Sequence, residues 1–162
     1  GLTYFYRPNK WSAFSDDSIG KTPQKLGDNL YVITPSIPIP DSFASRFPFA
    51  QELNRKVLKK SVREGLMKLD ITRQPVAWLY NPLQLYYLGI ADEQLSIFEI
   101  HDEYGVKGLR GRDKKMNQLE IEMMKKVDLV FTTAKVLKQS KSIYRKDIHW
   151  FPNAANVKLF AH

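Results

Sequence analysis

LSIFEI, at Leu95–Ile100, is the first of three short apolar runs in the last third of the chain. The other two are VDLVFTT at Val127–Thr133 and IHWFPN at Ile148–Asn153, and a segment suited to a helix precedes each of them. Short apolar strands that alternate with helices of about ten residues are typical of parallel βαβ units. The sequence therefore predicts an α/β fold with a Rossmann-like parallel sheet and flanking helices.

Polar residues follow the first of these runs, where an open parallel sheet places its ligand site. His101, Asp102 and Glu103 stand directly after Ile100. A histidine or a carboxylate in this position can take a proton from a hydroxyl group or hold it in place. We interpret His101 and Asp102 as candidate catalytic residues and Glu103 as a candidate substrate ligand. In the structural alternative, Asp102 closes a turn and His101 packs against the strand end.

Four further candidate substrate ligands stand where other predicted strands end: Tyr80, Asn81, Thr133 and Asn153. Tyr80 and Asn81 would line the same crevice as His101, and Thr133 faces a helix N-terminus, which attracts anions. Each has a structural alternative as well. Tyr80 would be a buried aromatic residue, Asn81 and Asn153 would be turn residues, and Thr132 or Thr133 would cap the following helix.

Apolar residues at steps of three and four predict an amphipathic helix over Phe49–Leu69. Its buried face would hold Leu53, Val57, Leu58, Val62, Leu66 and Leu69, and its outer face Arg55, Lys56, Lys59, Lys60, Arg63 and Lys68. Gly65 would weaken this helix by about 1 kcal/mol relative to alanine. Three shorter helices are predicted over Leu83–Leu88, over Asn117–Lys126 and from Thr132 or Thr133 to Tyr144.

The remaining segments are interpreted as strands and connectors. Strands are predicted at Leu2–Tyr6, at Leu30–Thr34 and at Val76–Tyr80, the last buried on both faces. Arg7–Asp28 and Lys107–Lys115 are predicted as loops. Pro35–Pro48 holds too many prolines for a helix or a central strand, so we expect an extended connector with Ile37, Ile39 and Phe43 as apolar anchors.

Composition sets limits on the class of protein. The chain has 162 residues, 25 Lys and Arg against 17 Asp and Glu, and a net charge of +8. This surplus favours polyanions such as nucleic acid, anionic lipid or phosphorylated small molecules, or it is only a solvated basic surface. The sequence contains no cysteine, which excludes disulfides and thiolate metal sites and fits a reducing cytoplasm. It also lacks a run of about 18 apolar residues, so we expect no membrane span.

Four segments together resemble the N-terminal domain of GT-B glycosyltransferases of the family 4 type. They are Trp78–Pro82 (WLYNP), Phe98–Glu103 (FEIHDE), Val127–Thr133 with its helix, and Phe151–Asn153 followed by Phe160. The resemblance spans about Leu30 to Phe160. Ala154 and Asn156 replace the glycine and aspartate that usually follow Pro-Asn in this family.

The resemblance implies a partial N-terminal Rossmann-like domain over residues 1–162, without the first strand and without the C-terminal domain of the family. It implies transfer of a sugar from a nucleotide-sugar donor, held by that C-terminal domain, to a glycan or lipid-linked acceptor in envelope polysaccharide biosynthesis. We expect no metal or other cofactor, a cytoplasmic location at the inner face of the membrane, and no turnover by this segment alone. An exposed sheet edge further predicts a homo-oligomer.

A basic, non-catalytic binding module for nucleic acid or an anionic membrane surface is the alternative. It predicts affinity that falls steeply with salt concentration. The sequence carries no signature of a nucleic-acid-binding fold, so the leading interpretation expects no nucleic acid partner. The glycine-rich motif of a dinucleotide-binding enzyme is also absent from the sequence.

Overall fold

The computed structural model describes residues 3–6, 23–33, 38–39, 41–44, 46–104 and 111–153. The chain divides into two compact units, a first unit of residues 1–74 and 89–92 and a second unit of residues 75–88 and 93–162. The single domain expected over residues 1–162 stays a prediction. The positions Ala154, Asn156 and Phe160 of the family resemblance lie outside the described residues, and so does the first part of the loop predicted over Lys107–Lys115.

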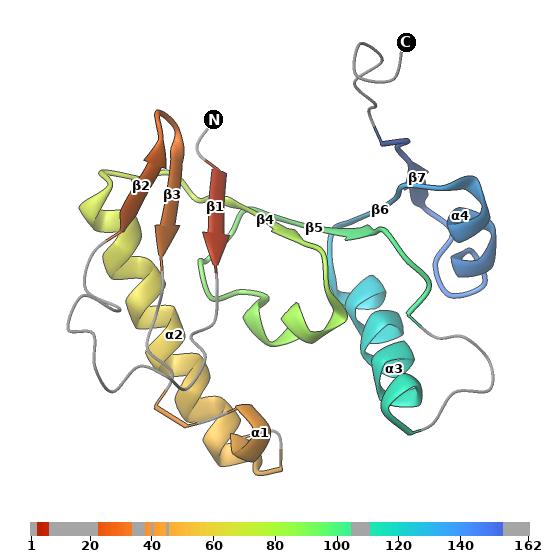
Figure 1. Ribbon diagram of the computed structural model, residues 1–162, viewed down its shortest axis with the longest axis horizontal. Helices are drawn as coiled ribbons and strands as arrows, with labels where there is room; N and C mark the ends of the chain where they lie inside the picture. The colour runs from red at the N-terminus through yellow and green to blue at the C-terminus, as the bar shows by residue number, and fades with distance from the viewer. Residues whose placement is uncertain are drawn as a thin grey trace, which may run out of the picture. The chain divides into compact units, whose positions relative to one another are not determined.

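The second unit is built on a four-stranded sheet in the order β4-β5-β6-β7 (Figure 1). The strands are Val76–Leu79 (β4), Leu95–Ile100 (β5), Leu129–Thr132 (β6) and Ile148–Trp150 (β7). All adjacent strands run parallel. The predicted α/β class with a Rossmann-like parallel sheet is therefore confirmed, and β5 has the predicted bounds.

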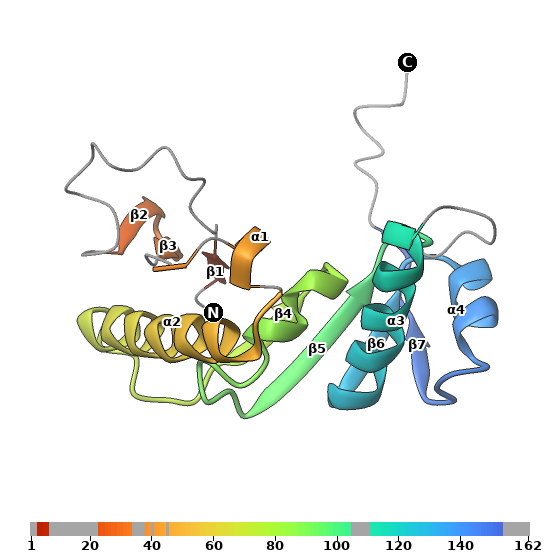
Figure 2. The same cartoon turned by 90° about the horizontal axis from the view of Figure 1, so that it is seen from below.

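Helices connect these strands and cover one face of the sheet. They are the 3-10 helix η1 (Pro82–Tyr87) and the α-helices α3 (Gly111–Lys126) and α4 (Lys135–Lys141). In Figure 1, η1 and α3 lie below the row of strands, and Figure 2 shows α3 from its outer side. Between them and the sheet lies the core of the unit, which consists of Leu79, Leu85, Phe98, Ile100, Leu119, Met123, Met124, Val127, Val130, Leu137 and Ile148.

A side-chain contact fixes the register of β5 and β6 where they begin. The Asp128 carboxylate accepts hydrogen bonds from the Ser96 backbone N–H at 2.7 Å and from Ser96 Oγ at 2.6 Å. These bonds hold the pKa of Asp128 below its usual value. Asp128 therefore has a structural role at the start of β6.

Three predictions about the second unit were wrong. Strand β4 is not buried on both faces, because Val76 and Trp78 are exposed on the face opposite η1. Helix α3 begins at Gly111 and not at Asn117, so the second half of the predicted loop is helical; its lysines are good helix formers. Helix α4 ends at Lys141, and its N-cap is Ala134 without a side-chain hydrogen bond, so no threonine caps it.

The first unit contains a three-stranded sheet in the order β1-β3-β2. Strand β1 (Thr3–Tyr6) pairs in parallel with β3 (Leu30–Ile33), and β2 (Gln24–Gly27) pairs with β3 in antiparallel orientation. The predictions of β1 and β3 are confirmed. The loop predicted over Arg7–Asp28 was wrong at β2, which backbone pairing stabilises despite its polar sequence.

Two helices complete the first unit, α1 (Asp41–Ala44) and α2 (Pro48–Lys68). Helix α2 confirms the predicted amphipathic helix to within one residue. Helix α1 interrupts the connector that was predicted to be extended throughout, in its proline-free stretch. Asn54 is buried on α2, where its side chain accepts from Ile39 N–H at 3.1 Å and donates to Ile39 O at 2.7 Å. Leu53, predicted to be buried, is 47% exposed.

Gly65 lies where α2 packs closely against β3. A Cβ atom at this position would stand 2.7 Å from Ile33 Cδ1. We expect Gly65→Leu to lower the free energy of unfolding of the first unit by about 1–3 kcal/mol, because a larger side chain would force the helix and the strand apart. Urea unfolding measures the change. Glu64→Leu is the matched control, since Glu64 is exposed, and an equal loss in both variants would contradict the close packing.

Candidate functional site

Three predicted site residues meet at one edge of the second unit's sheet, where its parallel strands end. Tyr80 follows β4, His101 follows β5 and Thr133 follows β6. The Tyr80 and His101 rings are stacked, with centroids 5.3 Å apart and planes 28° from parallel. Thr133 continues the ladder beyond β6, since its backbone N–H donates to Ile100 O at 3.2 Å. The strand-end argument therefore brings the Tyr80 and His101 side chains together as expected, and it places Thr133 at the same edge of the sheet.

Glu99 is a member of this group that the sequence analysis missed. Its Oε1 lies 3.7 Å from His101 Nε2, and its Oε2 accepts a hydrogen bond from Trp78 Nε1 at 2.6 Å. Burial and the negative charge of Glu99 raise the pKa of Tyr80. A signal was present in the sequence, because residues two apart on a strand point to the same face. Glu99 and His101 have this spacing.

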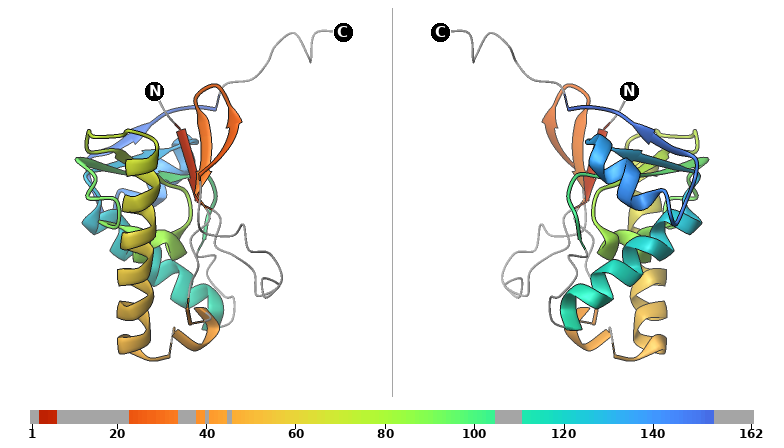
Figure 3. Two further views of the ribbon diagram at one scale, coloured as in Figure 1. Left: turned by 90° about the vertical axis from the view of Figure 1, so that its left-hand side faces the viewer. Right: turned by 90° about the vertical axis from the view of Figure 1, so that its right-hand side faces the viewer.

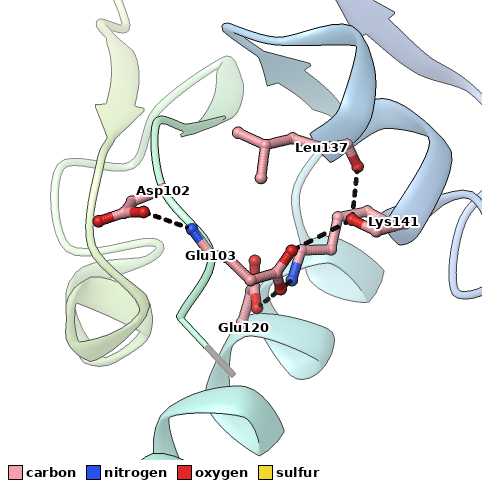
Figure 4. Close-up of polar contacts among 6 residues, drawn as sticks. Asp102, Glu103, Glu120, Leu137 and Lys141 are labelled. Atoms are coloured by element: carbon pink, nitrogen blue, oxygen red, sulfur yellow. Dashed lines mark hydrogen bonds and ion pairs between the residues drawn. The ribbon is translucent and has the colours of Figure 1, made fainter. Parts of the chain in front are cut away.

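Glu103 does not join the group around His101. Figure 4 shows its carboxylate next to the amino group of Lys141, which also contacts Glu120 of α3. Lys141 Nζ lies 2.9 Å from Glu120 Oε2, and Ser140 Oγ lies 3.3 Å from Glu103 Oε2. The Glu103 side chain therefore ties the segment after β5 to α3 and α4.

The three charged groups form a partly buried cluster, which we call the Lys141 cluster: Glu103, Glu120 and Lys141. The side chains of Glu120 and Lys141 are 0% and 3% exposed. Burial raises the pKa of Glu120 against the opposing effect of Lys141. Burial alone would lower the pKa of Lys141, but hydrogen bonds with both carboxylates outweigh it, so that this pKa is raised. The ammonium group is therefore held in its charged form.

The segment Asp102–Tyr104 has hydrogen bonds of its own. Asp102 Oδ1 accepts from the Glu103 backbone N–H at 2.8 Å, as in the structural alternative for Asp102. Tyr104 Oη donates to Tyr80 O at 2.9 Å and so links this segment to the end of β4. Burial and the charges of Asp102 and Glu120 raise the pKa of Tyr104. Asp102 remains exposed beside His101.

No protein-family model and no curated protein matched the chain. What can be said of function therefore depends on the geometry of this edge of the sheet.

The two predicted asparagines have no recognised contact with the Tyr80 and His101 rings among the described residues. Asn81 Oδ1 accepts from the Leu83 N–H at 2.9 Å, and Gln84 Oε1 accepts from the Asn81 N–H at 2.9 Å, which is a capping box for η1. Asn153 lies beyond β7 and is exposed. The side chain of Asn81 is thus engaged in capping.

The chemistry available at this edge is that of an imidazole, carboxylates and aromatic rings. Among the residues that the structure describes, no group of three or more His, Asp and Glu side chains could hold a metal ion. The described helices also include none that is long and apolar enough to cross a membrane. His101, with Glu99 on one side and Tyr80 against its ring, is the group best suited to proton transfer.

Proposed function

We propose that this chain provides the acceptor-side part of a glycosyltransferase, which moves a sugar from a nucleotide-sugar donor to a hydroxyl group of a glycan or glycolipid. The observation that supports this proposal most directly is the grouping of Tyr80, Glu99 and His101 at the carboxyl ends of adjacent parallel strands. In open α/β sheets, ligands bind at this edge. The resemblance of four sequence segments to GT-B enzymes supports the same assignment.

His101 would act as the general base. Its imidazole accepts the proton of the acceptor hydroxyl while that oxygen forms a bond to the anomeric carbon, and the bond from this carbon to the nucleoside diphosphate breaks. Glu99 Oε1, 3.7 Å from His101 Nε2, would stabilise the positive charge that the ring acquires. Asp102, exposed beside His101, would hold a neighbouring hydroxyl of the acceptor.

Aromatic rings at this edge and on the adjoining exposed face of the sheet would bind the acceptor. Tyr80 and Trp78 are 40% and 45% exposed, and the Glu99 carboxylate lies between Trp78 Nε1 and the ring of His101. Rings of this kind bind the apolar faces of ligands, and the carboxylate accepts hydrogen bonds from their hydroxyl groups. In the proposal, the nucleotide part of the donor binds to a separate domain, and the acceptor is a glycan or a lipid-linked glycan.

Saccharide binding at this edge is the first test. We expect glycosides and glycolipid head groups to shift the NMR signals of Tyr80, His101 and Trp78. Tyr80→Ala should weaken this binding by about three- to tenfold, the equivalent of 0.5–1.5 kcal/mol for a lost aromatic contact. Tyr144→Ala is the matched control, because Tyr144, which follows α4, is exposed to a similar degree (39%).

The proposal fails if no saccharide shifts these signals, or if both tyrosine variants bind equally well. Titration with DNA and RNA over a range of salt concentrations tests the alternative of a nucleic-acid-binding module. A log–log slope of several units, with shifts that avoid Tyr80 and His101, would favour that alternative.

A further inference from the structure

A cluster of phenylalanines is exposed where α1 leads into α2, within the first unit. Phe43, Phe47 and Phe49 are 50%, 40% and 69% exposed. The ring centroids of Phe43 and Phe47 are 4.8 Å apart and those of Phe47 and Phe49 are 6.0 Å apart, so the rings form one patch. We call these three residues the phenylalanine patch. Figure 3 shows α1 beside the first turns of α2.

The patch overturns an expectation about the connector before α2. Phe43 is not an apolar anchor, because its ring is exposed, whereas the backbone of Ile39 is hydrogen-bonded to Asn54 of α2. Ile37 lies outside the described residues. Monomeric proteins rarely expose contiguous apolar surface without a binding role. The patch is therefore a candidate interaction surface.

The exposed face of α2 continues from the patch to the other end of the helix. Phe49, Leu53, Lys56, Lys60 and Met67 follow one another at steps of four, three, four and seven residues, which places them on one face. Leu53 is 47% exposed and Met67 is 74% exposed. Both lysines are exposed as well. This face therefore has apolar side chains toward both ends and charged side chains in the middle.

Acidic residues accompany the lysines on this face. Glu52 is exposed four residues before Lys56. Glu64 is exposed beyond Lys60, and its Oε1 lies 4.0 Å from Lys60 Nζ. Because the face carries both signs of charge, a second copy of the same face can complement it, whereas a uniformly basic face would repel its copy.

Asp92 reduces the positive charge of the helix beside this face. It lies 2.5 Å from Lys59 Nζ and 2.5 Å from Arg63 Nη2, and all three residues belong to the first unit. Helix α2 has six basic residues in all. Two of them are thus paired with Asp92, which limits the repulsion between two copies of the helix.

We propose that the protein forms a homodimer in which two copies of α2 pack antiparallel on this face, with the two-fold axis at Lys60. In such an interface, residues at equal distances on either side of the axis stand opposite each other. Lys56 and Glu64, each four residues from Lys60, are then paired between the copies, twice in the dimer. Leu53 and Met67, each seven residues from Lys60, are paired in the same way. The phenylalanine patch of one copy thus lies next to Met67 of the other, so that both apolar ends are covered.

The charges select this register over a neighbouring one. An axis at Leu58 would place Lys56 opposite Lys60 and Glu52 opposite Glu64, which are pairs of like charge. With the axis at Lys60, the two copies of Lys60 approach each other, but Glu64 of the same chain accompanies each of them. Charged residues that flank the contact of two helices commonly determine the orientation of the pair in this way.

Charge reversal tests the dimer. Sedimentation equilibrium should show a dimer for the wild type, and Lys56→Glu or Glu64→Lys should each weaken it about tenfold or more, because each reversal creates two contacts between like charges. An equimolar mixture of the two variants should recover the dimer, since both pairs in the mixed dimer again join opposite charges. Lys125→Glu is the matched control, because it makes the same change of charge at an exposed lysine of the second unit.

The apolar ends are tested by Met67→Ser. We expect it to weaken the dimer about tenfold or more, since the dimer buries two copies of this side chain. Ile143→Ser is the matched control, because Ile143 is exposed to nearly the same degree (72%) in the second unit. Circular dichroism checks that all variants fold.

Three results would overturn the proposal, which does not depend on glycosyltransferase activity. The first is a wild type that stays monomeric at its highest soluble concentration, whether or not it binds another partner such as anionic vesicles. The second is a dimer that neither charge reversal weakens, which is the result expected of pairing through an exposed sheet edge. The third is a mixture of Lys56→Glu and Glu64→Lys that is no more dimeric than its two components.

Discussion

Lys141→Met is expected to lower the free energy of unfolding of the second unit by about 3–5 kcal/mol, because it leaves a buried carboxylate without its cation. Lys141 Nζ donates a hydrogen bond to Glu120 Oε2 at 2.9 Å, and it also pairs with Glu103. The other oxygen of Glu120 is buried and has no hydrogen-bond partner among the described residues. Methionine fills the volume but donates no hydrogen bond.

Urea unfolding followed by tryptophan fluorescence measures this loss, since Trp78 and Trp150 lie in the second unit. The matched control is Lys138→Met, one turn earlier on α4, where the lysine is exposed. We expect the control to change stability by no more than about 0.5 kcal/mol. In the double variant Lys141→Met with Glu120→Gln, the unpaired carboxylate charge is removed, so part of the lost stability should be recovered.

The pH dependence of Lys141→Met follows from the raised pKa of Glu120. A carboxyl group whose pKa is raised by folding stabilises the fold below its unfolded pKa, and this contribution is lost as pH rises through the folded pKa. Without Lys141, this pKa rises further. The variant should therefore be least stable at alkaline pH and recover as the pH falls through the raised pKa of Glu120. A flat profile, or a loss no larger than that of Lys138→Met, would contradict the buried cluster.

The strands of the second unit could be predicted because apolar composition determines them. Strand β5 lies in the middle of the sheet, and its run LSIFEI contains four buried residues, so its pattern is unambiguous. Strand β2 has the sequence QKLG and pairs only through its backbone at an edge, which leaves no apolar signal. For strand β4 the position was predicted but the burial was wrong, because an apolar run on an edge strand exposes alternate residues.

The site was predictable where it depends on strand ends and not where it depends on helix packing. Parallel strands end at the same edge, and this alone brings Tyr80 and His101 together. The partner of Glu103 lies 38 residues further along the chain, on a helix face that no local pattern specifies. One signal was available for Glu120. It stands four residues after Met116 and three before Met123, on the apolar stripe of α3, where an acid requires a buried partner.

Arg145→Met is expected to lower the free energy of unfolding of the second unit by about 2–3 kcal/mol, because it leaves helix-end carbonyl groups without donors. Arg145 Nη1 donates to Met124 O at 2.7 Å and to Val127 O at 2.6 Å, and Nη2 donates to Asp128 O at 2.7 Å. Its side chain is only 15% exposed. One guanidinium group thus caps the C-terminus of α3.

Arg145→Lys should recover little of this stability, since a single ammonium group cannot reproduce the planar fork that reaches three carbonyl groups. Lys146→Met is the matched control, because Lys146 is the exposed neighbouring residue. Urea unfolding at neutral pH ranks the three variants. If Arg145→Lys had the stability of the wild type, Arg145 would stabilise the unit through its positive charge near the helix end and not through the hydrogen bonds of its guanidinium group.

Asp147 makes the stability of the second unit depend on pH through its pairing with the same arginine. Arg145 Nε and Nη2 each donate to the Asp147 carboxylate at 2.8 Å, and this pairing lowers the pKa of Asp147 to about 2. A carboxyl group with a lowered folded pKa stabilises the fold above its unfolded value, 3.8, and this contribution is lost as the pH falls toward 2. Arg145→Met removes the cause of the shift. The stability difference between wild type and variant should therefore narrow between pH 4 and pH 2, and a difference that stayed constant over this range would show that Asp147 does not depend on Arg145.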